Sequence, residues 1–185
     1  MSDRLEVLFV CTANICRSPA MELMAREMAA QAPGEVVVSF SSAGTHARDG
    51  QPMNPPMAQT LPPGLADGFR SRHLTTSMLQ AADLVLTAEA VHRQHVLDDH
   101  PQLHRTVFTL GQFAAATADE PGTSGRALIE AVAARRRPSA PGHDVADPYR
   151  RGAAAALRAT GTMSTMLTVI VPRLLGARRH TGEGA

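Results

Sequence analysis

The sequence predicts a single-domain α/β protein in three layers, with a four-stranded parallel sheet flanked by helices on both faces. Four short apolar runs, at residues 6–10, 36–40, 84–87 and 106–110, alternate with helical stretches or loops, which is typical of such a sheet. A loop rich in functional side chains directly follows the first run, where ligands bind in parallel sheets. The 185 residues suffice for one core, and no linker or repeat divides them.

We expect residues 1–176 to form this domain and residues 177–185 to form a flexible tail. A helix opens at Ser18-Pro19, and its methionines recur at core-facing spacing. Prolines interrupt the connection at residues 52–63, which leaves room for a short helix. A further helix begins near Arg126 and ends in the arginine run 135–137, and a long alanine-rich helix spans about 150–173. Residues 114–125 and 138–143 are predicted to be mobile loops that gate a nearby acid or connect helices.

Composition excludes several classes of protein. The net charge of +1 gives no reason to expect a nucleic-acid partner. Residues 163–175 are apolar but short, and they contain Pro172 and Arg173, so we expect a core helix rather than a membrane span. The chain has two cysteines and no recognisable secretory segment, which favours the cytoplasm. The histidines lack metal-ligand spacing, so no metal or other cofactor is predicted.

The loop Cys11-Thr12-Ala13-Asn14-Ile15-Cys16-Arg17-Ser18 carries a nucleophile and an anion clamp together. Its backbone N–H groups and the start of the following helix form an anion nest. A helix N-terminus, the Arg17 guanidinium and the Ser18 hydroxyl favour the thiolate of Cys11. The planar guanidinium can hold two oxygens of a phosphoryl group while the sulfur attacks phosphorus. This pattern indicates phosphate chemistry. The alternative is a buried, inert cysteine beside a solvated arginine.

The tripeptide Asp147-Pro148-Tyr149 supplies the other half of the reaction. A phosphomonoester leaving group needs a proton, and Asp147 is the candidate general acid. As a carboxylate, the same group can then accept a proton from the attacking water. Pro148 stiffens the loop, and Tyr149 offers a ring for an aromatic substrate.

These residues, together with Ser41-Ser42-Ala43-Gly44-Thr45, resemble the low molecular weight protein tyrosine phosphatase family. The resemblance implies a Rossmann-like or flavodoxin-like fold and a small, cytosolic, metal-free enzyme, a monomer or weak homodimer. It further implies hydrolysis of phosphotyrosine through a cysteinyl phosphate, with Cys11 as nucleophile, Arg17 as clamp and Asp147 as acid. The residues that it places in substrate binding are Thr12, Ala13, Asn14, Ile15, Cys16, Ser18 and Tyr149, with Ser42 and Arg72 behind them. Asn14, Ser18 and Ser42 would also hold the loop and the thiolate by hydrogen bonds.

The chain departs from the family pattern at several positions. Phe69 stands where the family usually has a histidine, so a hydrogen bond that supports the loop is expected to be missing. Residues 46–50 replace an aromatic wall of the slot with a polar one, Arg150 replaces a second aromatic, and Glu89 replaces an aspartate. These changes suggest a smaller or more acidic substrate that Arg48 and Arg150 could pair with, or else drift in solvated loops.

Other functions stay open. Ile15 favours phosphotyrosine, because the family's phosphoarginine phosphatases favour threonine there. A small phosphomonoester is the alternative substrate. An arsenate reductase would need relay cysteines beyond Cys16, and a non-catalytic phosphate-binding regulator would typically have lost Cys11 or Asp147. Cys16 could form a reversible disulfide with Cys11 or simply pack beneath the loop.

Overall fold

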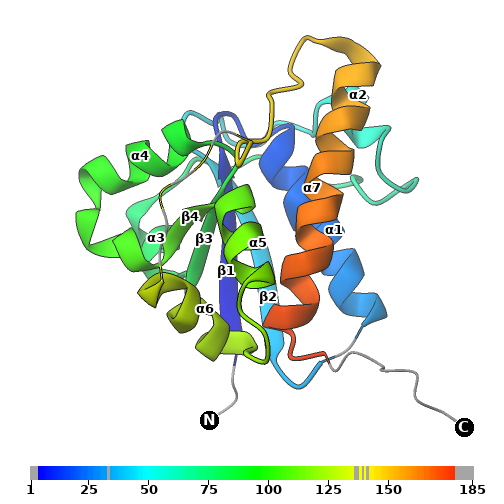
Figure 1. Ribbon diagram of the computed structural model, residues 1–185. Helices are drawn as coiled ribbons and strands as arrows, with labels where there is room; N and C mark the ends of the chain where they lie inside the picture. The colour runs from blue at the N-terminus through cyan, green and yellow to red at the C-terminus, as the bar shows by residue number, and fades with distance from the viewer. Residues whose placement is uncertain (1–3, 33, 136–137, 139, 141, 178–185) are drawn as a thin grey trace, which may run out of the picture.

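The computed structural model describes residues 4–32, 34–135, 138, 140 and 142–177. Its strands β1 (Arg4–Cys11), β2 (Val37–Gly44), β3 (Leu84–Thr87) and β4 (Val107–Thr109) form one parallel sheet in the order β2-β1-β3-β4 (Figure 1). All four predicted strands are confirmed. Strand β2 continues past residue 40 because its partner β1 pairs with it in register until Cys11 meets Gly44.

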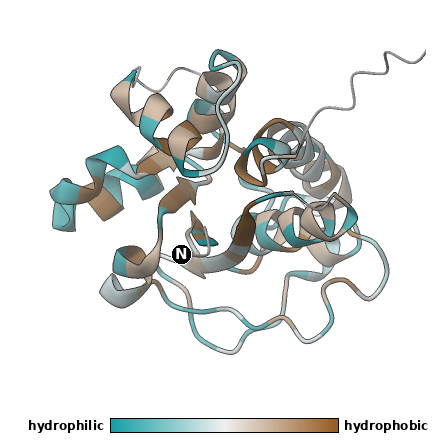
Figure 2. Ribbon diagram, turned by 90° about the horizontal axis from the view of Figure 1, so that it is seen from below, coloured by the Kyte–Doolittle hydropathy of each residue, from teal (hydrophilic) through white to brown (hydrophobic). Residues whose placement is uncertain are grey.

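Helices cover both faces of the sheet, as predicted. They are α1 (Arg17–Gln31), α2 (Pro55–Ala58), α3 (Thr76–Ala81), α4 (Ala90–Asp99), the 3-10 helix η1 (Pro101–Arg105), α5 (Leu110–Ala118), α6 (Gly125–Ala134) and α7 (Gly152–Leu174). Figure 1 shows α1 and α7 side by side on one face, with α3 and α4 on the other. Figure 2 shows the apolar strands enclosed between these layers.

Strand β1 contributes side chains to two separate hydrophobic cores, because successive side chains point to opposite faces of the sheet. Val7 and Phe9 belong to the larger core, under α1, α5, α6 and α7. Leu8 and Val10 belong to the smaller core, under α3 and α4. Burial on both faces explains why the strand reads as a continuous apolar run, and it places the end of β1 in the middle of the molecule.

The prediction of a loop over residues 114–125 is wrong in its first part, because helix α5 continues to Ala118. The Thr109 side chain caps this helix by accepting a hydrogen bond from the Gln112 N–H (3.1 Å). Phe113 is fully buried and packs edge-on against Phe108, which anchors a segment that its alanine-rich sequence alone does not reveal. Residues 136, 137, 139, 141 and 178–185 lie outside the described residues, so the predicted tail beyond residue 177 stays a prediction, as does the part of the predicted loop 138–143 that falls on residues 139 and 141.

Helix α7 is the one helix in the described part of the chain whose length and composition would allow it to cross a membrane, a test that core helices of soluble proteins also pass. Its apolar side chains Met163, Leu167 and Ile170 are fully buried in the larger core, and the helix packs on α1, α2 and α5. This packing supports the prediction of a core helix.

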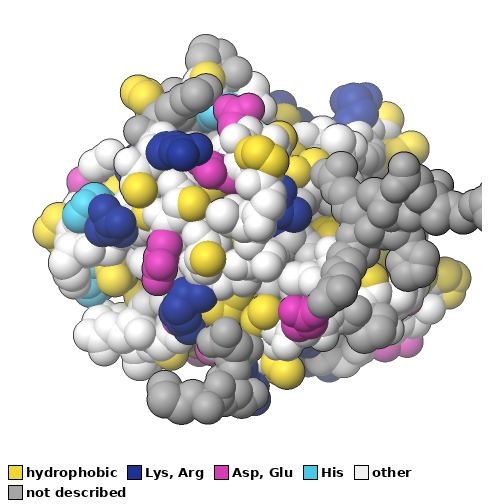
Figure 3. All heavy atoms as spheres, turned by 60° about the horizontal axis from the view of Figure 1, so that its bottom comes forward, with side chains coloured by type: hydrophobic (Ala, Val, Ile, Leu, Met, Phe, Trp, Pro, Cys, Tyr) yellow, Lys and Arg dark blue, Asp and Glu magenta, His cyan; other side chains and the backbone are white. Residues whose placement is uncertain are grey.

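One face of the surface carries mixed charge. Figure 3 shows arginine and acidic side chains of the described residues interspersed with apolar ones on the lower face of the molecule. A basic stripe of the kind that tracks a nucleic-acid backbone is not formed by the described residues on this face.

Candidate active site

The loop between β1 and α1 forms the centre of the site. Strand β1 ends at Cys11 and α1 begins at Arg17, so five residues reverse the chain. Asn14 takes a left-handed conformation (φ 53°) that asparagine tolerates better than most residues. Helix α1 has no side-chain cap and no acidic residue in its first turn. Its first N–H groups are therefore open to an anion.

Backbone hydrogen bonds from residues 45–54 hold this loop from behind. The carbonyl oxygens of Cys11, Thr12 and Ile15 accept from the N–H groups of residues 45, 46 and 54, at 2.7–2.9 Å. In a trans peptide the N–H points opposite to the C=O. The N–H groups that follow these carbonyls are therefore turned toward the open side of the loop, as an anion nest requires.

Asn14 ties the loop together from inside. Its Nδ2 donates to Ser18 Oγ and to Ser42 Oγ, both at 2.8 Å, and its Oδ1 accepts from the Arg72 N–H at 2.8 Å. Both amide protons are used, although Phe69 stands at the family's histidine position. Phe69 instead packs against the larger core. The two amide protons and the carbonyl oxygen of the Asn14 side chain thus have partners without a histidine at residue 69.

A chain of hydrogen bonds connects the Glu22 carboxylate to the Cys11 sulfur. The Glu22 carboxylate pairs with Arg26 (2.6 Å) and accepts from the Ser42 hydroxyl. Because Ser42 donates there, it accepts from Asn14, which fixes the orientation of the amide. Ser18 Oγ likewise accepts from Asn14, and it lies 3.0 Å from Cys11 Sγ and 3.2 Å from the Ala43 carbonyl. The single Ser18 hydroxyl proton is donated to the Ala43 carbonyl, and it can turn to Cys11 Sγ, which is as near, to stabilise a thiolate.

Gly44 lets the second strand approach the loop closely. A Cβ atom at this position would lie 2.6 Å from the Thr12 carbonyl oxygen and 2.8 Å from the Asn14 nitrogen. Both atoms belong to the backbone, which cannot move aside without deforming the anion nest. Glycine at residue 44 is therefore required by the shape of the site.

We predict that Gly44→Ala lowers the free energy of unfolding by about 1–3 kcal/mol, the usual cost of overpacking, and lowers kcat/KM as well. Chemical unfolding and aryl phosphate turnover check this result. Gly161→Ala in α7 is the matched control, since its Cβ would meet no atom within 4 Å, and it should be neutral or stabilising. Equal stability and activity in both variants would contradict the prediction.

Arg17 is almost fully buried (2% exposed), and its two terminal nitrogens contact three neighbouring residues. Nη1 donates to Glu89 Oε2 at 2.5 Å and to the Val145 carbonyl at 3.0 Å, and Nη2 lies 3.4 Å from Asp147 Oδ1. Among the described residues, Nε has no hydrogen-bond partner. A buried N–H donor without a partner is costly, and an anion bound in the loop would satisfy it.

The loop that carries Asp147 is held by hydrogen bonds to residues just after β3 and at the start of α4. The Val145 N–H donates to the Ala88 carbonyl, and Asp144 Oδ1 accepts from the Ala90 N–H, both at 2.8 Å. In Figure 1 the yellow segment before α7 lies over the upper end of the sheet, where β1 ends. These bonds bring Asp147 to Arg17 from the far end of the chain, and its carboxyl stays 44% exposed.

A cavity of ≈ 190 Å³ collects most of the predicted site residues. Its lining consists of Cys11, Thr12, Ala13, Ile15, Cys16, Arg17, Asp147 and Tyr149. Asn14 and Ser18 do not line it, because their side chains are buried behind the loop. Together with Ser42 and Arg72, they support the cavity rather than face a substrate. Arg72 does so through its N–H and through Nη2, which donates to the Ser42 carbonyl at 2.9 Å.

The structure revises the predicted polar wall. Residues 46–50, Arg48 included, do not line the cavity, and the His46 ring instead contacts the His95 ring, with centroids 5.3 Å apart. Arg150 has a positive φ of 58° and places its guanidinium 5.2 Å from the centre of the Tyr149 ring. The Tyr149 ring, which lines the cavity, is therefore in cation–π contact with Arg150.

Two nearby groups have strongly shifted pKa values. Burial, reinforced by Cys11 and Asp147, raises the pKa of the Cys16 thiol to about 12 against the opposing effect of Arg17. Cys16 is therefore a neutral thiol at pH 7, and both cysteines are free. Burial, followed by the Arg17 charge, lowers the pKa of His92 to about 4, so its ring is neutral.

Sequence reasoning missed the roles of Glu89 and His92. In the sequence, Glu89 stands out only as a departure from the family pattern, yet its carboxylate holds Arg17. His92 Nε2 lies 2.8 Å from Thr12 Oγ1. The sequence signal that could have revealed these roles is that both residues follow closely after a buried strand. Parallel strands end at one edge of the sheet, where ligands bind.

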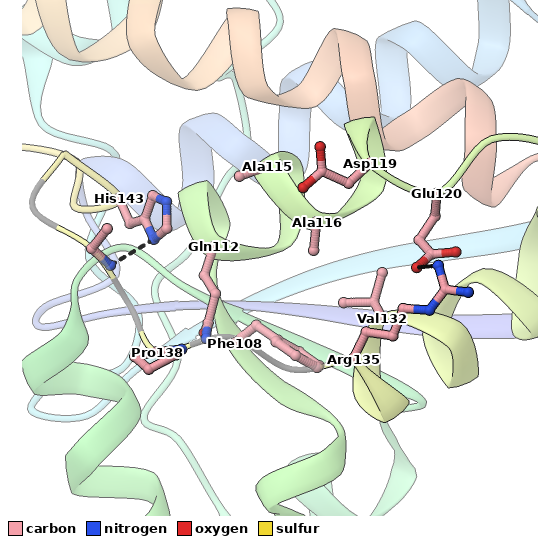
Figure 4. A pocket seen from close by; sticks show the side chains of 11 residues that line it. Phe108, Gln112, Ala115, Ala116, Asp119, Glu120, Val132, Arg135, Pro138 and His143 are labelled. Carbon is pink, nitrogen blue, oxygen red and sulfur yellow. Dashed lines mark hydrogen bonds and ion pairs between the residues drawn. The ribbon is translucent and has the colours of Figure 1, made fainter.

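A second cavity, of ≈ 300 Å³, lies between α5, α6 and the residues Pro138, Ala140 and His143 (Figure 4). Its lining includes the ion pair between Glu120 and Arg135 (2.6 Å) and the apolar side chains of Phe108 and Val132. It contains none of the predicted catalytic residues. Among the described residues, no group of three or more metal-ligating side chains is placed to hold an ion.

The geometry around Cys11 suits thiol attack on a phosphoryl group, with a guanidinium to hold the oxygens and a carboxyl group to protonate the leaving group. This chemistry places the protein among the cysteine-dependent phosphatases. Within that class, the sequence profile of the low molecular weight phosphotyrosine protein phosphatases matches residues 6–135, and the chain belongs to this family.

Individual relatives agree with this assignment. The chain is 28% identical over 170 residues to the "Probable low molecular weight protein-tyrosine-phosphatase EpsP" of Ralstonia nicotianae, which covers 91% of this chain and 94% of the relative. It is 30% identical over 110 residues to a protein-arginine-phosphatase of Bacillus subtilis, covering 59% and 72%. The structure of the YwlE arginine phosphatase from Geobacillus stearothermophilus superposes with a TM-score of 0.70 at 26% identity, covering 92% of both chains.

Proposed function

We propose that this phosphatase hydrolyses phosphotyrosine in proteins, or a related aryl phosphate, through a cysteinyl-phosphate intermediate. The observation that carries the proposal is the unpartnered Nε of the buried Arg17, beside Cys11 and Asp147 in one cavity. A phosphoryl group there would accept hydrogen bonds from Nε and Nη2 of one guanidinium, in the bidentate geometry that arginine favours.

In the first step, the Cys11 thiolate attacks phosphorus as Ser18 Oγ, 3.0 Å from the sulfur, stabilises its charge. The sulfur–phosphorus bond forms while the bond to the leaving oxygen breaks. Arg17 and the loop N–H groups hold the equatorial oxygens. Protonated Asp147 gives its proton to the leaving oxygen, so that a neutral phenol departs.

In the second step, water enters the vacated position. The Asp147 carboxylate takes a proton from this water as its oxygen attacks phosphorus. The phosphorus–sulfur bond breaks, inorganic phosphate forms, and Cys11 leaves as the thiolate. Asp147 ends protonated, ready for the next turnover, so one residue serves as acid and then as base.

The cavity walls favour an aromatic leaving group. Ile15 and the half-exposed Tyr149 ring, both in the cavity lining, supply apolar surface, against which a phenyl ring can pack. The relative from Ralstonia nicotianae is named as a tyrosine phosphatase. The relatives from Bacillus subtilis and Geobacillus stearothermophilus are named as arginine phosphatases, so phosphoarginine is the competing substrate, alongside a small phosphomonoester.

We predict that kcat/KM for a phosphotyrosine peptide exceeds that for the same peptide carrying phosphoarginine, and for an alkyl phosphate, by at least ~10-fold, the contribution of one well-packed aromatic contact. Parallel turnover assays, with Cys11→Ser as the blank, check this expectation. A preference for the phosphoarginine peptide would reject phosphotyrosine as the substrate. Comparable, weak turnover of all three would point to a small metabolite.

We also propose a cytoplasmic location and a monomer or weak homodimer that needs no metal or other cofactor, membrane or nucleic acid. The proposal rests on the low net charge, the packing of α7 in the core and a site in which thiol, guanidinium and carboxyl group supply the chemistry.

A further inference from the structure

A buried histidine stands behind the first residue of the loop. His92, in the first turn of α4, is 3% exposed. Its ring makes two hydrogen bonds: Nδ1 lies 3.2 Å from the Glu89 backbone nitrogen, and Nε2 lies 2.8 Å from Thr12 Oγ1. The ring therefore joins the start of α4 to the wall of the cavity.

These two contacts define the tautomer of the ring. A backbone N–H can only donate, so Nδ1 must carry a lone pair and Nε2 must carry the proton. His92 consequently donates to Thr12 Oγ1. The lowered pKa of the buried ring, next to Arg17, agrees with the neutral form that this arrangement needs.

The donation from His92 has a consequence for Thr12. Because Oγ1 accepts a hydrogen bond from the ring, the hydroxyl proton must point in another direction. Thr12 is exposed and lines the cavity beside Cys11 and Arg17. We propose that His92 is a positioning residue that orients the Thr12 hydroxyl to donate a hydrogen bond to an oxygen of the bound phosphoryl group. This inference rests on the proposed phosphatase function.

Glu89 contacts both the His92 ring and Arg17, the residue proposed to hold the phosphoryl group. Its carboxylate accepts from Arg17 Nη1 at 2.5 Å, while its N–H holds the His92 ring. One residue at the start of α4 thus positions two donors of the cavity, the guanidinium and the hydroxyl. The competing explanation is that His92 only caps α4, since the ring and the Glu89 side chain form a reciprocal capping box.

Two substitutions separate these explanations. In His92→Asn, the amide lies near the place of Nδ1 and can still accept from Glu89, but it cannot reach Thr12. In His92→Gln, the amide reaches the place of Nε2 and can still donate to Thr12. We predict that His92→Asn lowers kcat/KM for an aryl phosphate by about 10-fold, the value of one hydrogen bond in the transition state, and that His92→Gln loses less.

Thr12 variants complete the test. Thr12→Val removes the hydroxyl and should match His92→Asn, whereas Thr12→Ser keeps it and should stay closer to wild type. In the Thr12→Val background, His92→Asn should cause little further loss, because the two residues act through one hydroxyl. The competitive inhibition constant for inorganic phosphate should rise in the same variants.

Three results would overturn the inference. One is an unchanged kcat/KM in His92→Asn. Another is a double variant whose loss in kcat/KM equals the product of the two single-variant losses. The third is a loss of kcat/KM that simply parallels the fall in melting temperature across the variants. Failure of the proposed function is a different outcome. It would appear as a wild-type protein that hydrolyses aryl phosphate no better than Cys11→Ser, before any His92 variant is compared.

Discussion

Replacing Cys11 with serine is expected to abolish turnover of aryl phosphate while the fold and the binding of inorganic phosphate persist. Cys11 is buried at the end of β1, where a hydroxyl of similar size fits and can keep the contact with Ser18. A serine hydroxyl, however, is far weaker than a thiolate as a nucleophile. We expect a loss of at least ~10⁴-fold in kcat, in the range seen when a nucleophile is removed.

Rapid acid quenching followed by mass spectrometry should detect the phosphorylated Cys11 peptide in the wild type only. Cys16→Ser provides the comparison, because it changes the other cysteine in the same cavity. Burial raises the pKa of Cys16 to about 12, so this thiol is not an effective nucleophile at pH 7, and its loss should cost far less. Equal losses in the two variants would mean that Cys11 is not the attacking group.

Arg17→Lys is expected to cost about 10³-fold in kcat/KM, the upper range for loss of a transition-state donor in a buried site. Lysine keeps the positive charge. Its single ammonium group cannot contact Glu89, the Val145 carbonyl and two phosphoryl oxygens at once, as Nη1, Nη2 and Nε are arranged to do. Because the charge is retained, the loss would measure the fork geometry of the guanidinium.

Steady-state kinetics with an aryl phosphate, together with binding of inorganic phosphate, test this expectation. Arg158→Lys on the exposed side of α7 is the matched control and should leave kcat/KM unchanged. Glu89→Gln, which keeps the shape but removes the charge that holds Nη1, should give an intermediate loss. Retention of more than a tenth of wild-type kcat/KM in Arg17→Lys would show that charge alone suffices.

Local pattern explains why much of the protein could be predicted. The four strands were recognised because burial on both faces leaves uninterrupted apolar runs. Cys11 and Arg17 were recognised because nucleophile and clamp lie in one short loop, so their proximity depends on few residues. Asp147 was proposed as the acid from its residue type and its proline-stiffened loop, and the family resemblance supported that role. Its proximity to Arg17 leaves no local pattern, since the bonds that bring it there join Val145 to the Ala88 carbonyl and the Asp144 carboxylate to the Ala90 N–H.

The fold class, the nucleophile loop and its chemistry could be predicted without coordinates, because the apolar runs and the close spacing of Cys11 and Arg17 are local features of the chain. Four features of the site emerge from the three-dimensional contacts alone. Glu89 holds Arg17, and His92 hydrogen-bonds to Thr12. Asn14 and Ser18 lie behind the cavity, and residues 46–50 do not line it. Each of these facts depends on strand order and register, which place the ends of β1, β2 and β3 side by side. Such long-range contacts leave no periodic trace in the sequence.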